Sequence, residues 1–230
     1  MIDAALLSPA VAHLGKDGFI AYPTETVWGL GACADRPRAV ARLMAWKGRA
    51  EEAPMSVLVP SVDVAEQWGC RLEGPARELA DAFWPGPVTL VVPCAHSFAP
   101  GIEGKRGTLG LRCSSHPVAH ALSLAVARAG LGPLTSTSMN RTGEPPARDL
   151  AAARVLSAGP CDLGKPWLVS DPAHDAGGGR PSSVVDCTAT PPEILRAGAI
   201  DAARLEETWS RRTRSPMPKG PHRPTGEKTP

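Results

Sequence analysis

The stretch Ala21-Tyr22-Pro23-Thr24-Glu25-Thr26-Val27-Trp28-Gly29-Leu30-Gly31 joins a rigid bend to a dense set of polar groups. Residues 18–21 lead into it as a strand does, and Pro23 then removes a backbone donor and stiffens the path. Two threonine hydroxyls and a carboxylate follow, and the closing glycines let the backbone approach a ligand. The pattern indicates a small-molecule site or, on local grounds alone, a strand end that runs into a capped helix.

The composition of the 230-residue chain is that of one globular domain without a membrane segment. Its hydrophobic fraction of 43% is ordinary, and no run approaches the roughly 20 apolar residues of a membrane span. The N-terminus lacks the basic and then apolar layout of a signal peptide. The cysteines are scattered without paired metal spacing: Cys33, Cys70, Cys94, Cys113, Cys161 and Cys187. These features predict a cytoplasmic protein with reduced thiols.

The net charge of +2 is unevenly distributed along the chain. Residues 210–230 contain five prolines, six cations and one carboxylate, so they carry +5 and the remaining 209 residues carry −3. A segment of this composition buries too little apolar surface to fold. We therefore expect one folded domain over residues 5–205 and a disordered, basic, proline-rich tail over residues 206–230, which could contact RNA phosphates.

Hydrophobic periodicity and turn signals predict both helices and strands along the chain. Ser8 and Pro9 are expected to start the first helix, as its N-cap and first helical residue. The predicted helices cover residues 8–15, 37–46, 63–68, 75–83, 117–129 and 149–156. The predicted strands cover residues 18–21, 55–59, 88–92, 107–113 and 167–171.

Cations stand at the ends of two predicted elements. Lys47 and Arg49 flank a glycine where a helix ends, and Arg112 lies near the end of a strand. Such cations are either solvated charges, favoured by the negative helix terminus, or groups that reach inward to grip phosphate. An arginine would do so as a fork and a lysine as a point charge. The residues alone leave both interpretations open.

Two polar stretches downstream carry further candidate ligand contacts. Residues 135–140 place four hydroxyls and the amide of Asn140 after an apolar approach, and residues 177–186 join a glycine run to Ser182. Such groups either bond their own backbone in a loop or donate to phosphate and ribose oxygens.

The histidines and nearby acidic residues do not favour a metal site. Asp171, His174 and Asp175 are close together in a glycine-rich loop, which favours solvated turn residues over metal ligands. His116 precedes Pro117 and is expected to be a turn or cap residue rather than a ligand.

Five segments, in order along residues 5–205, resemble the motifs of the YrdC-domain family, the threonylcarbamoyl-AMP synthases called TsaC. They are Pro-Thr-Glu-Thr at 23–26, Lys-x-Arg at 47–49, Ser-Thr-Ser-x-Asn at 136–140, Pro-Ser at 181–182 and the strand that carries Arg196. The chain departs from the family pattern with Trp28 for Tyr, Ala50 for Pro and Met139 for Ala, and a Met139 that pointed into the cleft would narrow it. The resemblance implies an α/β fold of the YrdC type: a twisted mixed β-sheet with flanking helices and a concave cleft in a single domain.

The resemblance also implies the roles of individual residues. It implies that ATP is bound by Lys47, Arg49, Ser138, Asn140 and Arg196. It implies that threonine is bound by Thr24, Arg112 and Ser182. Catalysis would rest on positioning and on charge stabilisation by Lys47 and Arg49, because no convincing nucleophile set is present. Mg²⁺ would accompany ATP, without a metal ligand identified in the protein.

The implied reaction makes threonylcarbamoyl-AMP and pyrophosphate from L-threonine, bicarbonate or CO₂, and ATP. Such a nucleotidyltransferase would hand its product to a TsaD-containing complex that modifies tRNA. Two alternatives stay open. One is a non-catalytic YrdC-like protein that binds RNA or nucleotide, and the other is a stand-alone relative of the carbamoyl-phosphate-using YrdC domain of hydrogenase maturation.

Overall fold

The computed structural model describes residues 2–50, 53–159, 164–175 and 179–213 of the chain. Its helices are α1 Ala4–Leu14, α2 Pro37–Lys47, α3 Val62–Gln67, α4 Pro75–Phe83, α5 Pro117–Arg128, α6 Leu150–Ala158 and α7 Ala202–Thr213. Its strands are β1 Phe19–Tyr22, β2 Gly29–Ala32, β3 Ser56–Leu58, β4 Val88–Pro93, β5 Thr108–Arg112, β6 Leu134–Ser138, β7 Trp167–Leu168, β8 Ser183–Asp186 and β9 Glu193–Arg196. Each predicted helix and strand overlaps one of these elements, so the predicted α/β class is confirmed.

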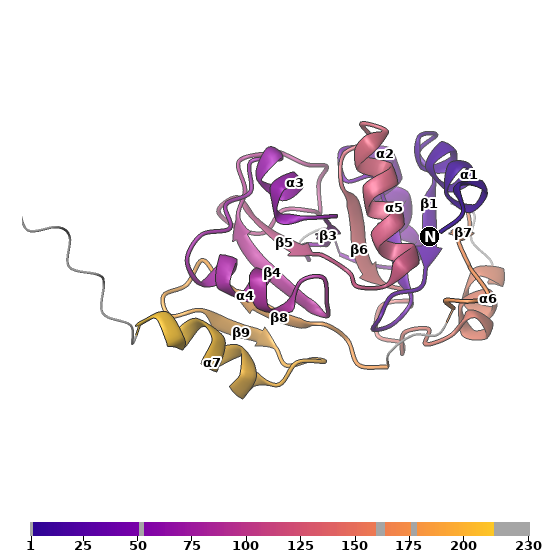
Figure 1. Ribbon diagram of the computed structural model, residues 1–230. Coiled ribbons are helices and arrows are strands. Elements are labelled where there is room, and N and C mark those ends of the chain that lie inside the picture. The colour runs from indigo at the N-terminus through magenta and orange to yellow at the C-terminus, as the bar shows by residue number, and fades with distance from the viewer. Residues whose placement is uncertain (1, 51–52, 160–163, 176–178, 214–230) are drawn as a thin grey trace, which may run out of the picture.

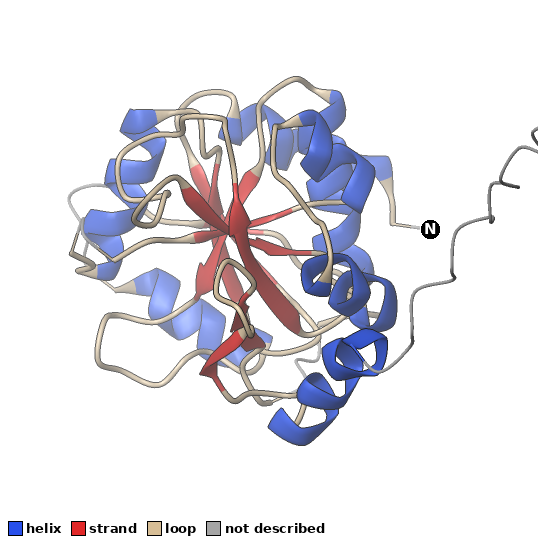
Figure 2. Cartoon of the chain, turned by 90° about the vertical axis from the view of Figure 1, so that its left-hand side faces the viewer, coloured by secondary structure: helices blue, strands red, loops and turns tan. Residues whose placement is uncertain are grey.

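The strands of the described residues form one mixed sheet in the order β7-β1-β2-β6-β3-β5-β4-β8-β9. The pairs β1–β7, β3–β5 and β4–β8 are parallel, and the other neighbouring pairs are antiparallel. The strands fan out with a marked twist at the centre of the molecule, with helices around them (Figure 2). Because β6 lies between β2 and β3, motifs far apart in the sequence meet at neighbouring strands.

Two apolar cores cover the two faces of the sheet. In β1, Phe19 and Ala21 join the larger core, whereas Ile20 and Tyr22 join the smaller one, because successive strand residues point to opposite faces. Helices α1 and α5 supply side chains to the smaller core and contact each other (Figure 1). Helices α2, α4 and α7 supply side chains to the larger core.

The first helix begins earlier than predicted. Asp3 is its N-cap, and the Asp3 side chain accepts a hydrogen bond from the amide of Ala5 at 2.9 Å. Ser8 and Pro9 lie inside α1, so their predicted roles as N-cap and first helical residue are wrong. Aspartate and serine cap helices about equally well, so cap preference did not distinguish the two possible starts.

The folded body extends past the predicted boundary at residue 205. Helix α7 packs against α4 and buries Leu205 and Trp209 in the larger core. These two side chains are four residues apart, which places them on one face of the helix. The predicted disordered tail is therefore wrong for residues 206–213, and residues 214–230 lie outside the described part of the chain.

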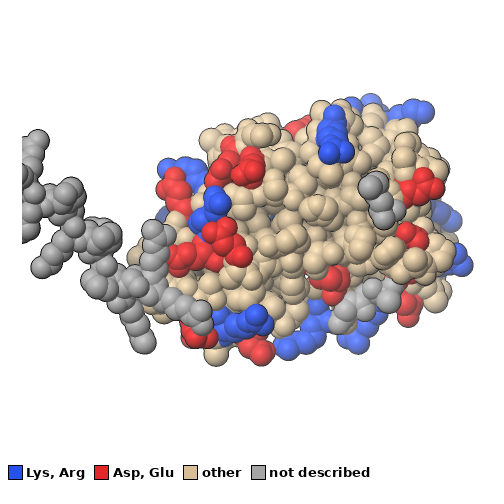
Figure 3. Space-filling view, viewed as in Figure 1, with Lys and Arg blue, Asp and Glu red and all other residues tan. Residues whose placement is uncertain are grey.

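The surface shows interleaved charges. On the face in Figure 3, acidic and basic side chains alternate over the left-hand part, and the middle carries few of either. The described residues on this face thus lack the continuous basic surface that phosphate backbones favour. None of the helices in the described ranges is both long and apolar enough to cross a bilayer.

Candidate functional site

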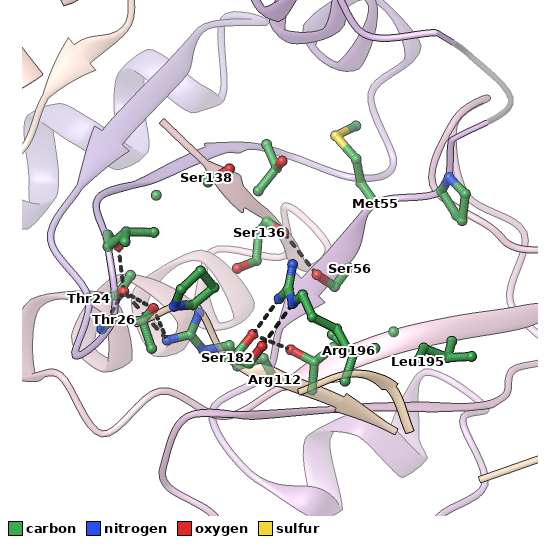
Figure 4. A pocket seen from close by; sticks show the side chains of 18 of the residues that line it. Thr24, Thr26, Met55, Ser56, Arg112, Ser136, Ser138, Ser182, Leu195 and Arg196 are labelled. Atoms are coloured by element: carbon green, nitrogen blue, oxygen red, sulfur yellow. Dashed lines mark hydrogen bonds between the residues drawn. The ribbon is translucent and has the colours of Figure 1, made fainter. Parts of the chain in front are cut away.

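A cavity of about 420 Å³ lies where the ends of several strands converge (Figure 4). Its walls come mainly from residues 24, 26–29, 54–56, 108–112, 136–138, 181–184 and 195–196. The sheet order explains this assembly, because β2, β6, β3 and β5 are successive neighbours and their ends face the same space. Each of the five motifs thus contributes at least one residue to the cavity lining.

The opening segment is the connection between β1 and β2, which pair with each other antiparallel. The alternative of a strand running into a capped helix is therefore wrong. Thr24 Oγ1 lies 2.9 Å from Thr26 Oγ1 and donates to the carbonyl of Val27 at 2.6 Å. These bonds fix two hydroxyls at the edge of the cavity.

The glycines of this segment are required by packing. A Cβ on Gly29 would lie 2.9 Å from the ring of Tyr22, and a Cβ on Gly31 would lie 2.8 Å from the side chain of Leu134. Gly29 also lines the cavity, which agrees with the close backbone approach expected there.

Arg112, at the end of β5, holds the threonine turn from across the cavity. Its Nη2 donates to Thr26 Oγ1 at 2.7 Å and to Thr24 Oγ1 at 3.4 Å, and lies 3.1 Å from Glu25 Oε1. Its Nε is buried and has no hydrogen-bond partner among the described residues. The guanidinium as a whole lines the cavity, so its positive charge is available to an anionic ligand there.

Glu25 keeps this guanidinium in place. Burial alone would raise the pKa of the Glu25 carboxyl, but the charge of Arg112 and the hydroxyl of Ser114, which donates to the carboxylate, together lower it. The carboxylate is therefore ionised at neutral pH and fixes Arg112 from behind.

Ser182 and Arg196 form a second wall, on β9 and on the residues that precede β8. Arg196 donates through Nε to the carbonyl of Ser182 at 2.9 Å and through Nη2 to its Oγ at 3.0 Å. Thr89 Oγ1 lies 3.1 Å from the same Oγ. Figure 4 shows the Arg196 guanidinium extended across the cavity toward Ser56 and Ser136.

The cavity favours an anionic ligand. Arg49, Arg112 and Arg196 line it, and none of the described residues that line it is an aspartate or a glutamate. Burial and the charge of Arg112 lower the pKa of Arg196, and burial lowers the pKa of Arg49. Guanidiniums held together with little solvent are stabilised by a phosphate or carboxylate between them.

Arg49 follows the C-cap of α2 and is held by backbone carbonyls. Its Nε donates to the carbonyl of Ala53 at 3.1 Å and its Nη2 to the carbonyl of Pro54 at 2.7 Å. The loop therefore orients this side chain toward the cavity even though Ala50 replaces the family's proline.

Lys47 lies behind the cavity wall instead of in it. Its Nζ donates to the carbonyl of Ser138 at 2.6 Å, to the carbonyl of Asn140 at 3.1 Å and to Asn140 Oδ1 at 2.8 Å. Gly48, with a φ of 64°, ends α2 in the left-handed conformation and turns the chain away. Burial and the nearby charge of Arg49 lower the pKa of Lys47 to about 8.

Ser138 is the cavity-facing member of this network. Its Oγ donates to Asn140 Oδ1 at 2.6 Å, and that amide is itself held by the carbonyls of Arg141 and Glu144. Lys47 and Asn140 thus fix the position of one hydroxyl that faces the ligand space.

Six of the eight site residues predicted from the sequence line the cavity: Thr24, Arg49, Arg112, Ser138, Ser182 and Arg196. Lys47 and Asn140 do not line it, but they contact Ser138 directly. The prediction missed six other lining hydroxyls, those of Thr26, Ser56, Thr89, Thr108, Ser136 and Thr137. Hydroxyls at the ends of predicted strands were the available signal for these residues.

Met139 does not enter the cavity. Its side chain is fully buried in the larger core and is not among the lining residues. Its amide donates to the carbonyl of Trp28 at 2.8 Å, and its carbonyl accepts from Ala147 at 2.9 Å. The methionine therefore does not narrow the cleft.

The remaining polar motifs have structural roles where they are described. The amide of Gly179 donates to the carbonyl of Thr26 at 2.7 Å, and the other two glycines of its run lie outside the described residues. His116 caps α5 through a hydrogen bond from the amide of Val118 at 3.3 Å, as predicted. His174 Nδ1 lies 3.0 Å from Asp171 Oδ2 within their loop.

Residues 12–198 match the Sua5/yciO/yrdC family model, which is described as "Telomere recombination". The chain belongs to this family. It is 37% identical over 201 residues to a putative threonylcarbamoyl-AMP synthase of Mycobacterium leprae, covering 87% of this chain and 86% of the relative. It is 42% identical over 154 residues to the threonylcarbamoyl-AMP synthase of Xanthomonas euvesicatoria, covering 66% of this chain and 80% of the relative.

The fold of the Sua5/YciO/YrdC family recurs in solved structures. The crystal structure of P. abyssi Sua5 complexed with L-threonine matches with a TM-score of 0.78 at 28% identity over 90% of this chain. The chain spans 58% of the length of that Sua5 protein. The predicted YrdC-type fold is thereby confirmed.

Proposed function

We propose that this chain is a threonylcarbamoyl-AMP synthase, which makes threonylcarbamoyl-AMP and pyrophosphate from L-threonine, bicarbonate or CO₂, and ATP. The proposal depends most on one observation: three arginines and a set of fixed hydroxyls line one cavity that has no described carboxylate in its wall. The proposed substrates ATP and L-threonine carry phosphates and a carboxylate, and arginines and hydroxyls bind these groups. The names of the curated relatives support the same activity.

The chemistry requires no nucleophile from the protein. The threonine amine takes up CO₂ to give a carbamate, and a carbamate oxygen attacks the α-phosphorus of ATP. The bond to the β,γ-phosphates breaks and pyrophosphate leaves, so the reaction is a nucleotidyl transfer. Catalysis then consists of holding the two anions in line and stabilising the charge that develops on the phosphate oxygens.

We assign the phosphate end of the cavity to Arg49, Arg196 and Ser138. The two guanidiniums bind phosphate oxygens as forks, and the Ser138 hydroxyl donates to the nucleotide. Lys47 and Asn140 act in this scheme through Ser138, because their own donors and acceptors are engaged with residues 138–144. Lys47 also adds positive charge behind the phosphates.

We assign the threonine end to Arg112, Thr24 and Ser182. Arg112 lines this end of the cavity, and its guanidinium charge would attract the threonine carboxylate. Thr24 and Ser182 add hydroxyls on either side of it. Discrimination between threonine and serine depends on one methyl group, which supplies about 1–3 kcal/mol, so we expect it to be imperfect.

We further propose that Mg²⁺ enters with ATP. The described cavity lining offers hydroxyls but no carboxylate, so the ion would be held by phosphate oxygens and water, with hydroxyls such as Ser138 as the nearest protein groups. The ion would neutralise phosphate charge. The product would then pass to a TsaD-containing complex for tRNA modification. Any contact of this chain with RNA would occur while the product is handed over.

Pyrophosphate release tests the function. The purified chain should release pyrophosphate only when ATP, threonine and bicarbonate are all present, and the product should have the mass of threonylcarbamoyl-AMP. Release that continues without threonine or bicarbonate would contradict the proposal. Turnover with carbamoyl phosphate in place of bicarbonate would support the hydrogenase-maturation class. Salt-sensitive RNA binding without any turnover would support the binding-protein alternative.

A further inference from the structure

Cys70 and Cys94 face each other across an isolated antiparallel bridge, away from the predicted site motifs. The bridge joins the residue that follows α3 and its turn to the residue that follows β4. Both thiols are free, and both side chains are buried, Cys70 at 2% exposure and Cys94 at 9%. The proposed synthase activity uses neither of them.

The hydrogen bonds around the bridge define its geometry. They connect the flanking residues and not the cysteines themselves: Arg71 N to Pro93 O at 2.9 Å and Ala95 N to Gly69 O at 3.0 Å. Cys70 and Cys94 are therefore a non-hydrogen-bonded antiparallel pair. The Cα atoms of such pairs lie about 4.5 Å apart and their side chains approach closely. Disulfides form at Cα separations of about 4.4–6.8 Å, so the backbone is already spaced for one.

The two sulfurs also differ in reactivity. The interaction between the two thiols lowers the pKa of Cys94 and raises that of Cys70, and Cys94 Sγ donates to the carbonyl of Trp68 at 3.5 Å. His96 also lowers the pKa of Cys94, whereas burial and Glu103 oppose the shift. One sulfur is thus suited to attack an oxidant and the other to resolve the product.

The other cysteines in the described residues lack such a partner. Cys33 pairs with Leu134 across its own bridge, and burial raises the pKa values of Cys33, Cys113 and Cys187. Their thiols are therefore poorer nucleophiles than Cys94.

We propose that Cys70 and Cys94 are a peroxide-sensitive dithiol that closes to a disulfide in the native backbone. The Cys94 thiolate attacks one oxygen of hydrogen peroxide, the O–O bond breaks, and after proton uptake the products are a sulfenic acid and water. The Cys70 thiol then attacks the Cys94 sulfur, and the sulfenic oxygen leaves as a second water. Two thiols and one peroxide give one disulfide and two waters, and a dithiol reductant reverses the reaction.

Mass spectrometry on the intact chain tests the proposal. After brief exposure to hydrogen peroxide, the mass of the intact chain should fall by two hydrogens relative to the reduced chain. After alkylation of the remaining free thiols, peptide mapping should recover Cys70 and Cys94 joined by a disulfide. Dithiothreitol should restore both as alkylated thiols. The Cys187→Ser variant should behave as the wild type does. In Cys70→Ser, Cys94 should instead advance to a sulfinic acid, since no resolving thiol remains.

A stability measurement provides a second readout that needs no variant. Oxidation should raise the thermal midpoint, because the crosslink restricts the unfolded chain without straining the folded one. Recovery of Cys70 and Cys94 as alkylated thiols, while another cysteine is oxidised, would overturn the proposal. A crosslink that lowers the thermal midpoint would overturn the claim that the native backbone accommodates it.

Discussion

The Nζ atom of Lys47 lies 2.8 Å from Oδ1 of Asn140, although the two residues are 93 positions apart in the chain. Lys47 ends α2, and Asn140 follows β6. The amide of Thr142 also donates to the carbonyl of Lys47 at 2.8 Å, so the segment that follows β6 is held against the end of α2. The family resemblance implied that Lys47 contacts the nucleotide. In the structure, Lys47 instead holds Asn140 and Ser138 in position.

Replacing Lys47 by methionine should lower kcat/KM for ATP by about 10- to 100-fold, since hydrogen bonds to a charged group are worth about 1.5–3 kcal/mol. The loss follows from releasing Ser138 and Asn140 from a shared donor. Steady-state pyrophosphate release measures it. Lys16→Met, at an exposed lysine, is the matched control and should retain wild-type rates. Unchanged kinetics in Lys47→Met would refute this role.

Replacing Arg196 by alanine should raise KM for ATP more than KM for threonine, by about 10- to 100-fold. The variant loses a phosphate fork but leaves Arg112 and its threonine turn in place. Separate titrations of the two substrates distinguish the effects. Arg128→Ala removes an exposed arginine from α5 and should change neither constant. A larger effect on threonine would reverse the assignment of the two ends of the cavity.

Glu25 should make the folded state sensitive to acid. Its pKa in the folded protein lies below the ordinary 4.5, so the unfolded chain binds the proton more readily. Stability from this group is present above the ordinary pKa and is lost as the pH falls through the folded value. The difference in unfolding free energy between the wild type and Glu25→Gln should therefore shrink on acidification.

Denaturant titrations of both proteins between neutral and acidic pH measure this difference. The exposed Glu144→Gln serves as the control and should follow the wild-type curve. A difference that stays constant with pH would show that Glu25 does not depend on Arg112 for its ionisation.

Replacing Met139 by alanine should reduce the unfolding free energy by about 2–5 kcal/mol through the cavity left in the core. The KM values for ATP and threonine should stay close to those of the wild type, because the side chain does not touch the ligand space. Val155→Ala, at a residue that is 74% exposed, should change stability by less than about 0.5 kcal/mol. A changed KM in Met139→Ala, with little loss of stability, would place the side chain in the cleft after all.

Much of the fold was predictable because its signals are local. Pro75 and Pro117 mark the starts of α4 and α5, and the β-branched run after the turn at residues 84–87 marks β4. The start of α1 was not predictable, since Asp3 and Ser8 are equivalent capping residues. Helix α7 was overlooked because the basic, proline-rich composition that follows it masked the spacing of Leu205 and Trp209.

The site was predictable at the level of which segments meet, and less so at the level of side-chain direction. Motif order identified Thr24, Arg112 and Ser182, all of which line the cavity. It could not show that Lys47 points at Asn140, since that depends on how the end of α2 packs against the segment after β6. Thr89 was missed although it stands near the start of a predicted strand, because the pairing of β4 with β5 that brings it to the cavity cannot be read from the local sequence.

Ser138 and Met139 are adjacent in the chain and face opposite sides of the wall, one toward the ligand space and the other into the apolar interior. A substitution at position 139 is therefore limited by how well the new side chain packs in the core. A substitution at position 138 is limited instead by the contact of its hydroxyl with the ligand. An alanine-to-methionine replacement at this site therefore reports on how the core is packed. It carries no information about whether the protein is an active catalyst.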